Sequence, residues 1–214
     1  MRVRRHQQVA VAASQGETVY VVRSGLLLLQ MLAPSKHRQL LSLFYPNDVF
    51  CTAFGPPFPA ATLVAAAASE LWRLPGRSFE AMLGDEPPLC QQLNRQLADQ
   101  HARSLLHVAM LGTLNGEERF ASFLVELGLR LGTSGSSGIS FQIPLSRNDI
   151  ADYLSLNPDT LSRITSRLKA RGLMVQTGRG RIVVPNWERL CEQTPIAPSL
   201  VALHRTTGKA AAEA

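Results

Sequence analysis

The sequence has 214 residues, of which 45% are hydrophobic and 18% charged, and this composition excludes a disordered chain. Its length predicts one or two globular domains, and no transmembrane helix is expected because no run of about 18 apolar residues occurs. The apolar run Val9–Ala13 is too short for a secretory signal, and the three scattered cysteines favour a reducing cytoplasm. The net charge of +6 is carried mostly by arginine, which is a weak pointer to nucleic acid as a partner.

The first third of the chain reads as short strands separated by turns. Residues 18–32 predict two strands around the turn Ser24-Gly25, and Leu40–Phe44 predicts a third strand. Phe54–Pro59 contains three prolines and predicts a loop. Residues 60–74 end in an alternating strand pattern, although their alanine run could equally favour a helix. Many short strands of this kind indicate a barrel or a sandwich.

Two helices are predicted after Pro75. Ser78 begins a short helix that covers Phe79–Leu83, and Pro87-Pro88 begins a long helix that ends near Leu111. A narrow apolar seam along the long helix favours a coiled-coil contact between two copies of the chain, with an ordinary core helix as the alternative. The residues expected to form this dimerisation seam are Leu89, Leu93, Leu97, Leu105 and Val108.

The next helix has a clear start and a clear end. Asn115, with Glu118 three residues later, predicts a capped helix over residues 117–131. The glycine-rich and serine-rich residues 132–138 then predict a flexible loop.

Residues 145–171 predict two helices joined by a three-residue turn. Ser146, with Asp149 three residues later, caps the first helix. Asn157 caps the second helix, and Pro158 occupies its first position, where the missing N–H costs nothing. Two helices joined in this way make a helix-turn-helix.

The second of these helices has one aliphatic face and one polar face. At 100° per residue, Leu161, Ile164 and Leu168 lie together, and only polar residues lie opposite. Any solvated helix shows such a face, but the preceding helix and the local charge favour DNA, since residues 145–185 hold seven Arg or Lys against three Asp, a net +4. The residues expected to read bases are Asp159, Ser162, Arg163 and Ser166, and those expected to contact phosphates are Ser146, Arg147, Thr160, Arg167, Lys169, Arg179 and Arg181.

A hairpin is predicted after the second helix. Its strands are Leu173–Thr177 and Arg181–Val184, and the glycine-flanked Arg179 at the tip would let the hairpin act as a wing that contacts phosphates. Trp187–Gln193 predicts a short closing helix, and the alanine-rich residues from Thr194 onward predict a mobile tail.

Taken together, these segments resemble the Crp/Fnr family of bacterial transcription regulators along nearly the whole chain. The most specific matches are Ser146-Arg-Asn-Asp-Ile-Ala-Asp-Tyr-Leu154 and Asp159-Thr-Leu-Ser-Arg163, with further matches at 20–25, 45–50, the long helix and 118–121. The resemblance implies an α+β fold with four parts: a sensor barrel of the double-stranded β-helix, jelly-roll or cupin-like type (1–86), a long dimerisation helix and hinge (87–114), a C-terminal winged helix-turn-helix (115–194) and a C-terminal tail (195–214).

The resemblance also implies a branch of the family and a DNA sequence. Members of the Fnr/FixK-like branch read DNA through Glu-x-x-Ser-Arg, which Ser162 and Arg163 match, whereas Asp159 is one methylene shorter than the family Glu. Pro158 stands where the cyclic-AMP receptor branch has Arg. We therefore expect a homodimeric, sequence-specific DNA-binding regulator that recognises an inverted repeat of TTGA-type half-sites and contacts RNA polymerase.

No cofactor, metal ion or catalytic residue is expected. Cyclic-nucleotide binders of the family carry Gly-Glu and Arg-Ser-Ala where this chain has approximately Cys51-Thr52 and Pro59-Ala60-Ala61, and residues 1–50 contain no cysteine for an iron–sulfur cluster. The five histidines show no pairing that indicates haem, and a cupin-like metalloenzyme would need a His-x-His pair that does not occur. The alternative to a regulator without a ligand is one whose barrel binds an unidentified small-molecule effector that switches DNA binding.

Overall fold

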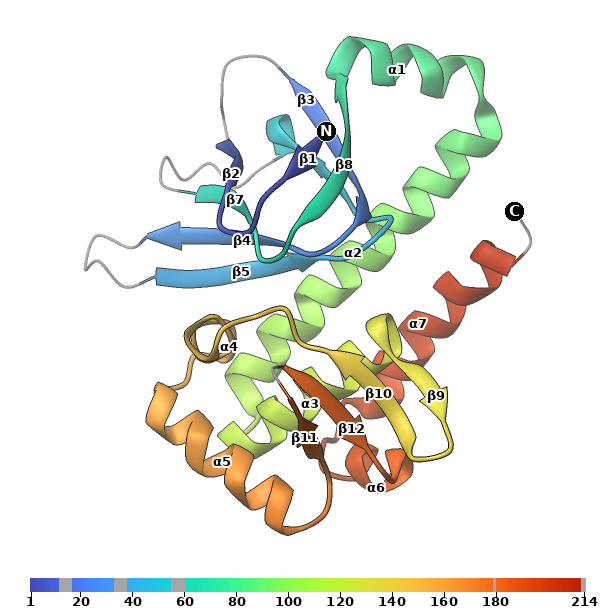
Figure 1. Ribbon diagram of the computed structural model, residues 1–214. Helices are drawn as coiled ribbons and strands as arrows, with labels where there is room; N and C mark the ends of the chain where they lie inside the picture. Colours follow the sequence, from blue (N-terminus) through green and yellow to red (C-terminus); the bar gives the residue numbers. More distant parts are fainter. Residues whose placement is uncertain (12–16, 33–37, 55–60, 179, 213–214) are drawn as a thin grey trace. The chain divides into compact units, whose positions relative to one another are not determined.

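The chain divides into two structural units, Met1–His101 and Ala102–Ala214, in the computed structural model (Figure 1). The structure describes residues 1–11, 17–32, 38–54, 61–178 and 180–212. Helix α2, Pro87–Thr113, begins in the first unit and ends in the second. Within the described residues, no helix is both long enough and apolar enough to cross a membrane.

The N-terminal unit contains the predicted barrel. Its described strands form two four-stranded antiparallel sheets, with the strand orders β1-β8-β3-β6 and β2-β7-β4-β5. Side chains from both sheets meet in one core, which includes Val22, Leu27, Phe44, Leu63 and Leu71. The strands are β1 (Arg2–Val3), β2 (Gln8–Val11), β3 (Thr18–Ser24), β4 (Leu27–Leu32), β5 (Arg38–Phe44), β6 (Val49–Cys51), β7 (Ala61–Ala65) and β8 (Ser69–Pro75).

The predicted turn at Ser24-Gly25 connects β3 to β4, and it requires a glycine. Gly25 has a φ of +92°, and a Cβ at this position would lie 2.1 Å from the Oγ of Ser69. The same Oγ accepts a hydrogen bond of 3.2 Å from the backbone N–H of Leu26. The turn therefore joins two strands and also contacts the start of β8.

Other predictions for this unit are refined by the structure. The helical alternative for the alanine-rich segment is wrong, because every second residue of β7 is buried against the core, as a strand requires. Helix α1, Gly76–Asp85, is longer at both ends than the predicted Phe79–Leu83. Phe54 ends a 3₁₀ turn, Thr52–Phe54, and the rest of the predicted loop lies outside the described residues.

The C-terminal unit is organised around helix α3, Gly116–Leu131, which buries Phe120, Phe123, Leu124 and Leu127. The predicted capping box is present: Asn115 Oδ1 accepts from the Glu118 N–H at 3.1 Å, and Glu118 Oε2 accepts from the Asn115 N–H at 2.8 Å. A four-stranded antiparallel sheet has the order β11-β12-β10-β9. The remaining elements are β9 (Thr133–Gly135), β10 (Gly138–Gln142), α4 (Arg147–Leu154), α5 (Pro158–Ala170), β11 (Val175–Thr177), β12 (Arg181–Val184), α6 (Trp187–Cys191) and α7 (Ala197–Ala212).

Two segments that the sequence predicted to be flexible are regular elements. The predicted loop 132–138 contains β9, because its backbone pairs with β10 at the edge of the sheet. The predicted mobile tail contains α7, which contacts α3 and buries Ala197 and Leu200. In both segments, small or polar side chains favour a loop when the sequence is considered locally. The partners that stabilise a strand and a helix there come from other parts of the unit.

Candidate nucleic-acid interface

Helices α4 and α5 form the predicted helix-turn-helix, and α4 begins at the predicted cap. The Oγ of Ser146 accepts from the Asp149 N–H at 3.1 Å and donates to Asp149 Oδ2 at 2.7 Å. Asp149 is only 5% exposed, so the cap is partly closed to solvent. Because the cap uses the one hydrogen of this hydroxyl, Ser146 can donate to a phosphate only by breaking the bond to Asp149.

The turn between the two helices is held by backbone and side-chain hydrogen bonds. Ser155 adopts the left-handed conformation with a φ of +51°, and the Leu156 N–H donates to the Ala151 carbonyl at 2.9 Å. Asn157 Oδ1 accepts from the Asp159 N–H at 2.8 Å, which confirms the predicted N-cap. These contacts set the direction in which α5 leaves the turn.

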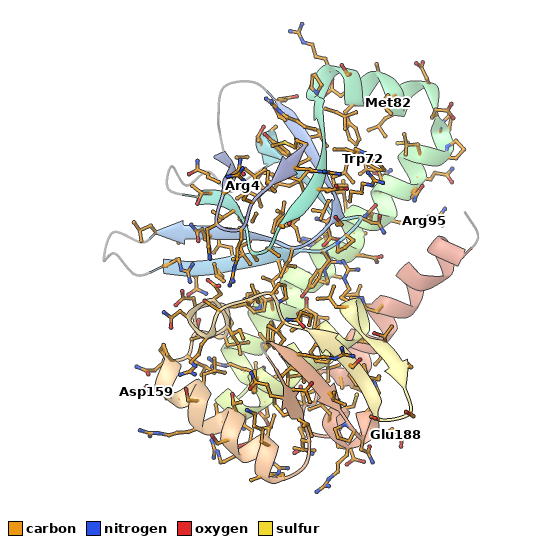
Figure 2. The ribbon with its side chains drawn as sticks, in the orientation of Figure 1. Arg4, Trp72, Met82, Arg95, Asp159 and Glu188 are labelled. Atoms are coloured by element: carbon orange, nitrogen blue, oxygen red, sulfur yellow. The ribbon has the colours of Figure 1, made fainter. Side chains whose placement is uncertain are left out.

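The two faces of α5 are those that the sequence predicted. Leu161, Ile164 and Leu168 are at most 2% exposed. On the opposite side, Asp159, Arg163 and Ser166 form an exposed ridge along the helix, which we call the α5 ridge; Asp159 is labelled in Figure 2. By helical angle, Ser162 and Lys169 lie along one side of the α5 ridge, and Thr160 and Arg167 lie along the other.

The polar groups on and beside the α5 ridge differ in whether they already have a hydrogen-bond partner within the chain. Among the described residues, the guanidinium of Arg163 has no hydrogen-bond or ion-pair partner. In contrast, the Ser162 hydroxyl donates to the Pro158 carbonyl at 2.8 Å, and the Ser166 hydroxyl donates to the Ser162 carbonyl at 3.1 Å. The serines therefore present methylene groups and acceptor lone pairs outward, and Arg163 presents donors.

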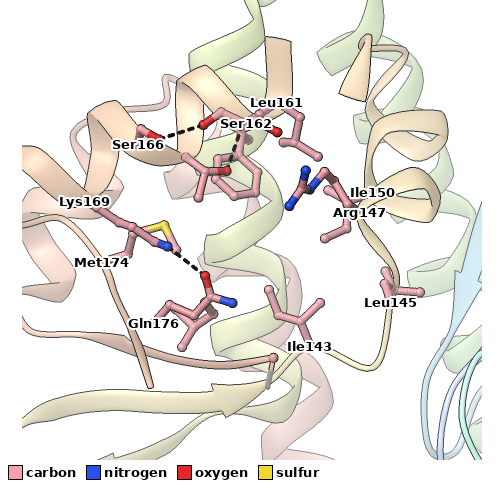
Figure 3. A pocket seen from close by; sticks show the side chains of 14 residues that line it. Ile143, Leu145, Arg147, Ile150, Leu161, Ser162, Ser166, Lys169, Met174 and Gln176 are labelled. Carbon is pink, nitrogen blue, oxygen red and sulfur yellow. Dashed lines mark hydrogen bonds between the residues drawn. The ribbon is translucent and has the colours of Figure 1, made fainter. Parts of the chain in front are cut away.

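A groove of about 400 Å³ lies between α5, the start of α4 and the hairpin (Figure 3). Arg147 reaches this groove from α4, and Ser162, Ser166 and Lys169 reach it from α5. Lys169 Nζ donates to Oε1 of Gln176 on β11 at 2.7 Å, which links α5 to the hairpin. Arg147 is exposed, and within the described residues its guanidinium has no partner.

The other side of the α5 ridge faces the start of α3. Arg167 Nη1 lies 3.6 Å from Glu117 Oε2, and Arg171 contacts both Glu117 and Gln193. Arg167 was predicted to contact phosphate, and its side chain remains 62% exposed although it is ion-paired. Thr160 is exposed beside it.

The hairpin confirms the predicted wing, with one change in its bounds. Strand β11 begins at Val175 rather than Leu173, because Leu173 is buried in the core before the strand starts. Arg181 is exposed on β12, and its Nη2 lies 3.5 Å from Ser140 Oγ. Arg179, predicted at the tip, lies outside the described residues.

The predicted dimerisation seam on α2 divides into two sets. Leu97, Leu105 and Val108 are 40%, 57% and 67% exposed. Leu89 and Leu93 are instead half-buried and line a cavity of the N-terminal unit. The exposed set is the part of the seam that another chain could cover.

Sequence reasoning missed Arg119, which connects the ends of two helices. Its Nε donates to the Leu114 carbonyl at 2.8 Å, and its Nη2 donates to the Leu111 carbonyl at 2.8 Å. Its Nη1 donates to the Leu154 carbonyl at the end of α4, at 3.2 Å. One guanidinium thus holds the C-terminus of α2 against the C-terminus of α4. No local pattern indicates this role, because the partners are up to 35 residues away.

Buried ionisable groups lie behind the helix-turn-helix. The His107 ring on α2 stacks on the Tyr153 ring of α4, with centroids 4.0 Å apart. Burial lowers the pKa of His107 to about 4, and burial, with the nearby Glu126, raises the pKa of Tyr153 above its ordinary value. Burial and the charges of Arg130 and Arg103 lower the pKa of His204 on α7 to about 3. Both histidines are therefore neutral at physiological pH and serve packing.

The part of the chain that the structure describes has no group of three or more His, Cys, Asp or Glu side chains placed to hold a metal ion.

Comparison with known families gives a match for each unit. Residues 1–86 match the cyclic nucleotide-binding domain family, and residues 118–193 match the Crp-like helix-turn-helix domain family. The first match covers the barrel, and the second covers α3, the helix-turn-helix and the wing.

Individual proteins are similar over most of the chain. The anaerobic regulatory protein of Pasteurella multocida is 26% identical over 83% of this chain, which corresponds to 65% of that protein's length, just under two thirds. The fumarate and nitrate reduction regulatory protein of Escherichia coli strain K12 is 25% identical over 89% of this chain and 76% of its own. The solved structure of FixK2 from Bradyrhizobium japonicum has a TM-score of 0.79 and 27% identity, covering 91% of this chain and 96% of that one.

A sensor-type barrel followed by a long helix and a winged helix-turn-helix defines a class of DNA-binding transcription regulators. The chain belongs to the Crp/Fnr family of these regulators, in its Fnr/FixK-like branch.

Proposed function

We propose that the chain is a homodimeric, sequence-specific regulator whose helix α5 lies in the major groove of DNA. The observation that carries this proposal is the α5 ridge, where the guanidinium of Arg163, which has no partner among the described residues, stands between small or short side chains. Arginine can donate two hydrogen bonds to guanine, and serine methylenes can pack against thymine methyl groups. Asp159 would accept from the cytosine amine at the outer part of the half-site.

The half-site sequence follows from the family resemblance and from the match to the Ser-Arg motif. We propose TTGA-type half-sites in an inverted repeat, with Arg163 on the guanine and Ser162 near the thymines. A two-fold dimer would place the two half-sites about one helical turn apart, roughly 34 Å.

Phosphate contacts would lie on both sides of the α5 ridge. On the groove side, Arg147 and Lys169 stand at the wall of one concave surface, and Arg181 lies on the wing. On the α3 side, Arg167 would exchange part of its ion pair with Glu117 for a phosphate, which makes it a weaker contributor. Thr160 is exposed and can donate its hydroxyl hydrogen, whereas Ser146 would have to break its bond to Asp149 first.

The proposal also assigns a role to each domain of the chain. Residues 1–86 would act as the sensor domain, 87–114 as the dimerisation helix and hinge, and 115–194 as the DNA-binding domain, with 195–214 closing that domain through α7. The proposal includes a cytoplasmic location, contact with RNA polymerase at promoters and no catalytic activity.

Binding assays with operator variants test the assignment of α5. Arg163→Ala should cost about 1–3 kcal/mol per half-site and relax the preference at the guanine. Arg181→Ala should instead weaken binding to every sequence alike and reduce the slope of log K against log salt by about 0.9. If Arg163→Ala weakens all operator variants equally, α5 is not the reading helix.

The dimer is tested through the exposed part of the α2 seam. Leu105→Asp would place a charge in the contact between two helices and should give a monomer that loses operator binding. Since Leu105 is 57% exposed in the single chain, the fold itself should tolerate the change. Arg95→Asp, at an exposed position of α2 away from the seam, should leave a dimer. Light scattering at micromolar concentration distinguishes these outcomes, and a monomeric native chain would contradict the proposal.

The alternative function, a barrel that binds a small-molecule effector, is favoured by one observation. The N-terminal unit contains a cavity that is large enough for a ligand. As far as the structure describes its lining, it includes none of Cys51, Thr52 and Ala61, which stand near the position of the family's cyclic-nucleotide motif.

A further inference from the structure

Two concave surfaces flank α5, and they carry opposite charge. The groove of Figure 3, on the side of the wing, is lined by Arg147 and Lys169 and, as far as the structure describes it, by no acidic side chain. A second hollow, of about 620 Å³, lies between α5, the start of α3 and the end of α6, and we call it the Glu117 hollow. One basic and three acidic residues line it, namely Arg167, Glu117, Glu118 and Glu192. The described lining therefore has a formal charge of +2 on the wing side and −2 on the α3 side.

The carboxylate of Glu117 contacts two arginines of α5 and its C-terminal end. Its Oε2 lies 3.6 Å from Arg167 Nη1, and its Oε1 accepts a hydrogen bond from Arg171 Nη1. The Nη2 of Arg171 donates to Oε1 of Gln193, so this guanidinium is held from two sides. The side chain of Glu117 is 24% exposed, whereas those of Arg167 and Arg171 are 62% and 43% exposed. The carboxylate is therefore fixed against α5, with both oxygens paired, in the chain without DNA.

The side chain of Glu117 is not part of the cap of α3. Glu118 closes the capping box, since its Oε2 accepts from the Asn115 N–H at 2.8 Å. Glu117 contributes only its backbone N–H, which donates to Asn115 Oδ1 at 3.0 Å. A substitution that removes the Glu117 carboxylate therefore changes the charge beside α5 and leaves the hydrogen bonds of the cap in place.

The position of Glu117 matters because a helix in the major groove has a phosphate backbone on either side of it. In the proposed complex, one backbone would face the groove of Figure 3 and the other would face the Glu117 hollow. A phosphate that approaches Arg167 must share the guanidinium with Glu117 or displace it, and the carboxylate repels the phosphate over a few ångströms. Exposed ion pairs are weak enough to be exchanged, so Arg167 stays available but contributes less.

We propose that Glu117 is a positioning residue that weakens the phosphate contacts on the α3 side of α5. It acts by holding the guanidinium of Arg167, so the protein binds DNA mainly through the backbone next to the wing. Glu117 thereby lowers the affinity for DNA of every sequence, while Arg163 still selects the operator. The inference rests on the proposed function, because it concerns how α5 lies on DNA. It goes further by naming a residue that contacts no base and sets the salt dependence of binding.

Binding of Glu117→Gln to an operator duplex and to a scrambled duplex, at several salt concentrations, tests the proposal. The variant keeps the size of the side chain and removes its charge. Its affinity should rise about threefold per half-site for both duplexes, with an unchanged ratio between them. The slope of log K against log salt should become steeper by about 0.9 per half-site, as one more phosphate contact requires. The matched control Glu188→Gln removes the same charge from an exposed position of α6, labelled in Figure 2, and should leave the slope unchanged.

A double-mutant cycle shows whether Glu117 acts through Arg167. In the Glu117→Gln chain, Arg167→Ala should reduce the salt slope by about 0.9 per half-site, and in the native chain by less than half of that. If Glu117→Gln does not fold, Arg167→Ala in the native chain decides alone. A reduction of about 0.9 there would overturn the proposal, and a smaller one supports it.

Three further results distinguish the possible failures. An unchanged salt slope in Glu117→Gln would overturn the proposal, as would an equal effect of Arg167→Ala in both chains. A lower operator affinity with an unchanged slope would also overturn it, because Glu117 would then only hold α5 against α3. A native chain without preference for the operator would instead contradict the proposed function, and the scrambled duplex would still test the role of Glu117.

Discussion

The burial of His107 makes the stability of the C-terminal unit depend on pH. His107 is 8% exposed, both of its ring nitrogens lack hydrogen-bond partners in the described structure, and burial lowers its pKa from 6.5 to about 4. In the unfolded chain the same ring binds a proton below about pH 6.5. The unfolded state therefore takes up a proton first as the pH falls, and the folded state loses stability between pH 6.5 and pH 4.

The size of this loss follows from the two pKa values. Between pH 7 and pH 4.5 the linkage expression gives about 2 kcal/mol for His107 alone, within the full difference of about 3 kcal/mol for 2.5 units. His107→Phe keeps an aromatic ring on Tyr153 and removes both the titration and the unsatisfied nitrogens. We expect the variant to be at least as stable as the native chain at pH 7. The difference in unfolding free energy between the variant and the native chain should then be about 2 kcal/mol larger, in favour of the variant, at pH 4.5 than at pH 7.

Urea unfolding at a series of pH values measures this difference. Trp187 lies in the C-terminal unit, so its fluorescence in a Trp72→Phe background follows that unit. The carboxylates that titrate in the same pH range, and His204 with its lowered pKa, are present in both chains. Their effects therefore cancel in the difference between the native chain and the variant. Parallel stability curves for the native chain and His107→Phe would refute the assignment of His107 as a buried neutral ring.

Two further substitutions test contacts that only the folded structure reveals. Arg119→Ala removes three hydrogen bonds to backbone carbonyls and should lower the stability of the C-terminal unit by about 2–3 kcal/mol in urea unfolding, while Arg189→Ala, at an exposed position of α6, should change it by less than about 0.5 kcal/mol. Gly138 has a φ of +105°, and a Cβ there would lie 2.1 Å from the Val184 carbonyl oxygen. Gly138→Ala should therefore lower the stability by more than about 1 kcal/mol, whereas the open position Gly135 should tolerate alanine. Equal effects of the two glycine substitutions would contradict this strand packing.

The helix-turn-helix was predictable because its signals are local. The caps at Ser146 and Asn157 involve side chains and N–H groups two or three residues apart. The faces of α5 follow from a period of 3.6 residues, so the burial of Leu161 and the exposure of Arg163 were fixed before any tertiary contact was known. The family resemblance rests on the same segment and extends it to a barrel and a long helix.

The partners of the predicted phosphate-contacting residues were not predictable. Arg167 pairs with Glu117, and so does the neighbouring Arg171, which was not among the predicted residues and is 54 positions from Glu117. Lys169 bonds Gln176 only because the hairpin folds back beside α5. The division of the α2 seam was not predictable either, because it depends on tertiary contacts. Leu89 lines a cavity of the N-terminal unit, whereas Leu105 is exposed.

The sequence by itself determined which residues begin each helix of the DNA-binding segment and which face of α5 is polar, because spacing along one chain decides those properties. Only the tertiary structure decided that residues 197–212 form a helix, that β9 pairs at a sheet edge, and that Trp72 of β8 lines the same cavity as Met82 of α1 and Leu93 of α2. Each of these depends on groups far apart in sequence, whose approach is set by how the hydrophobic faces of all the elements pack together.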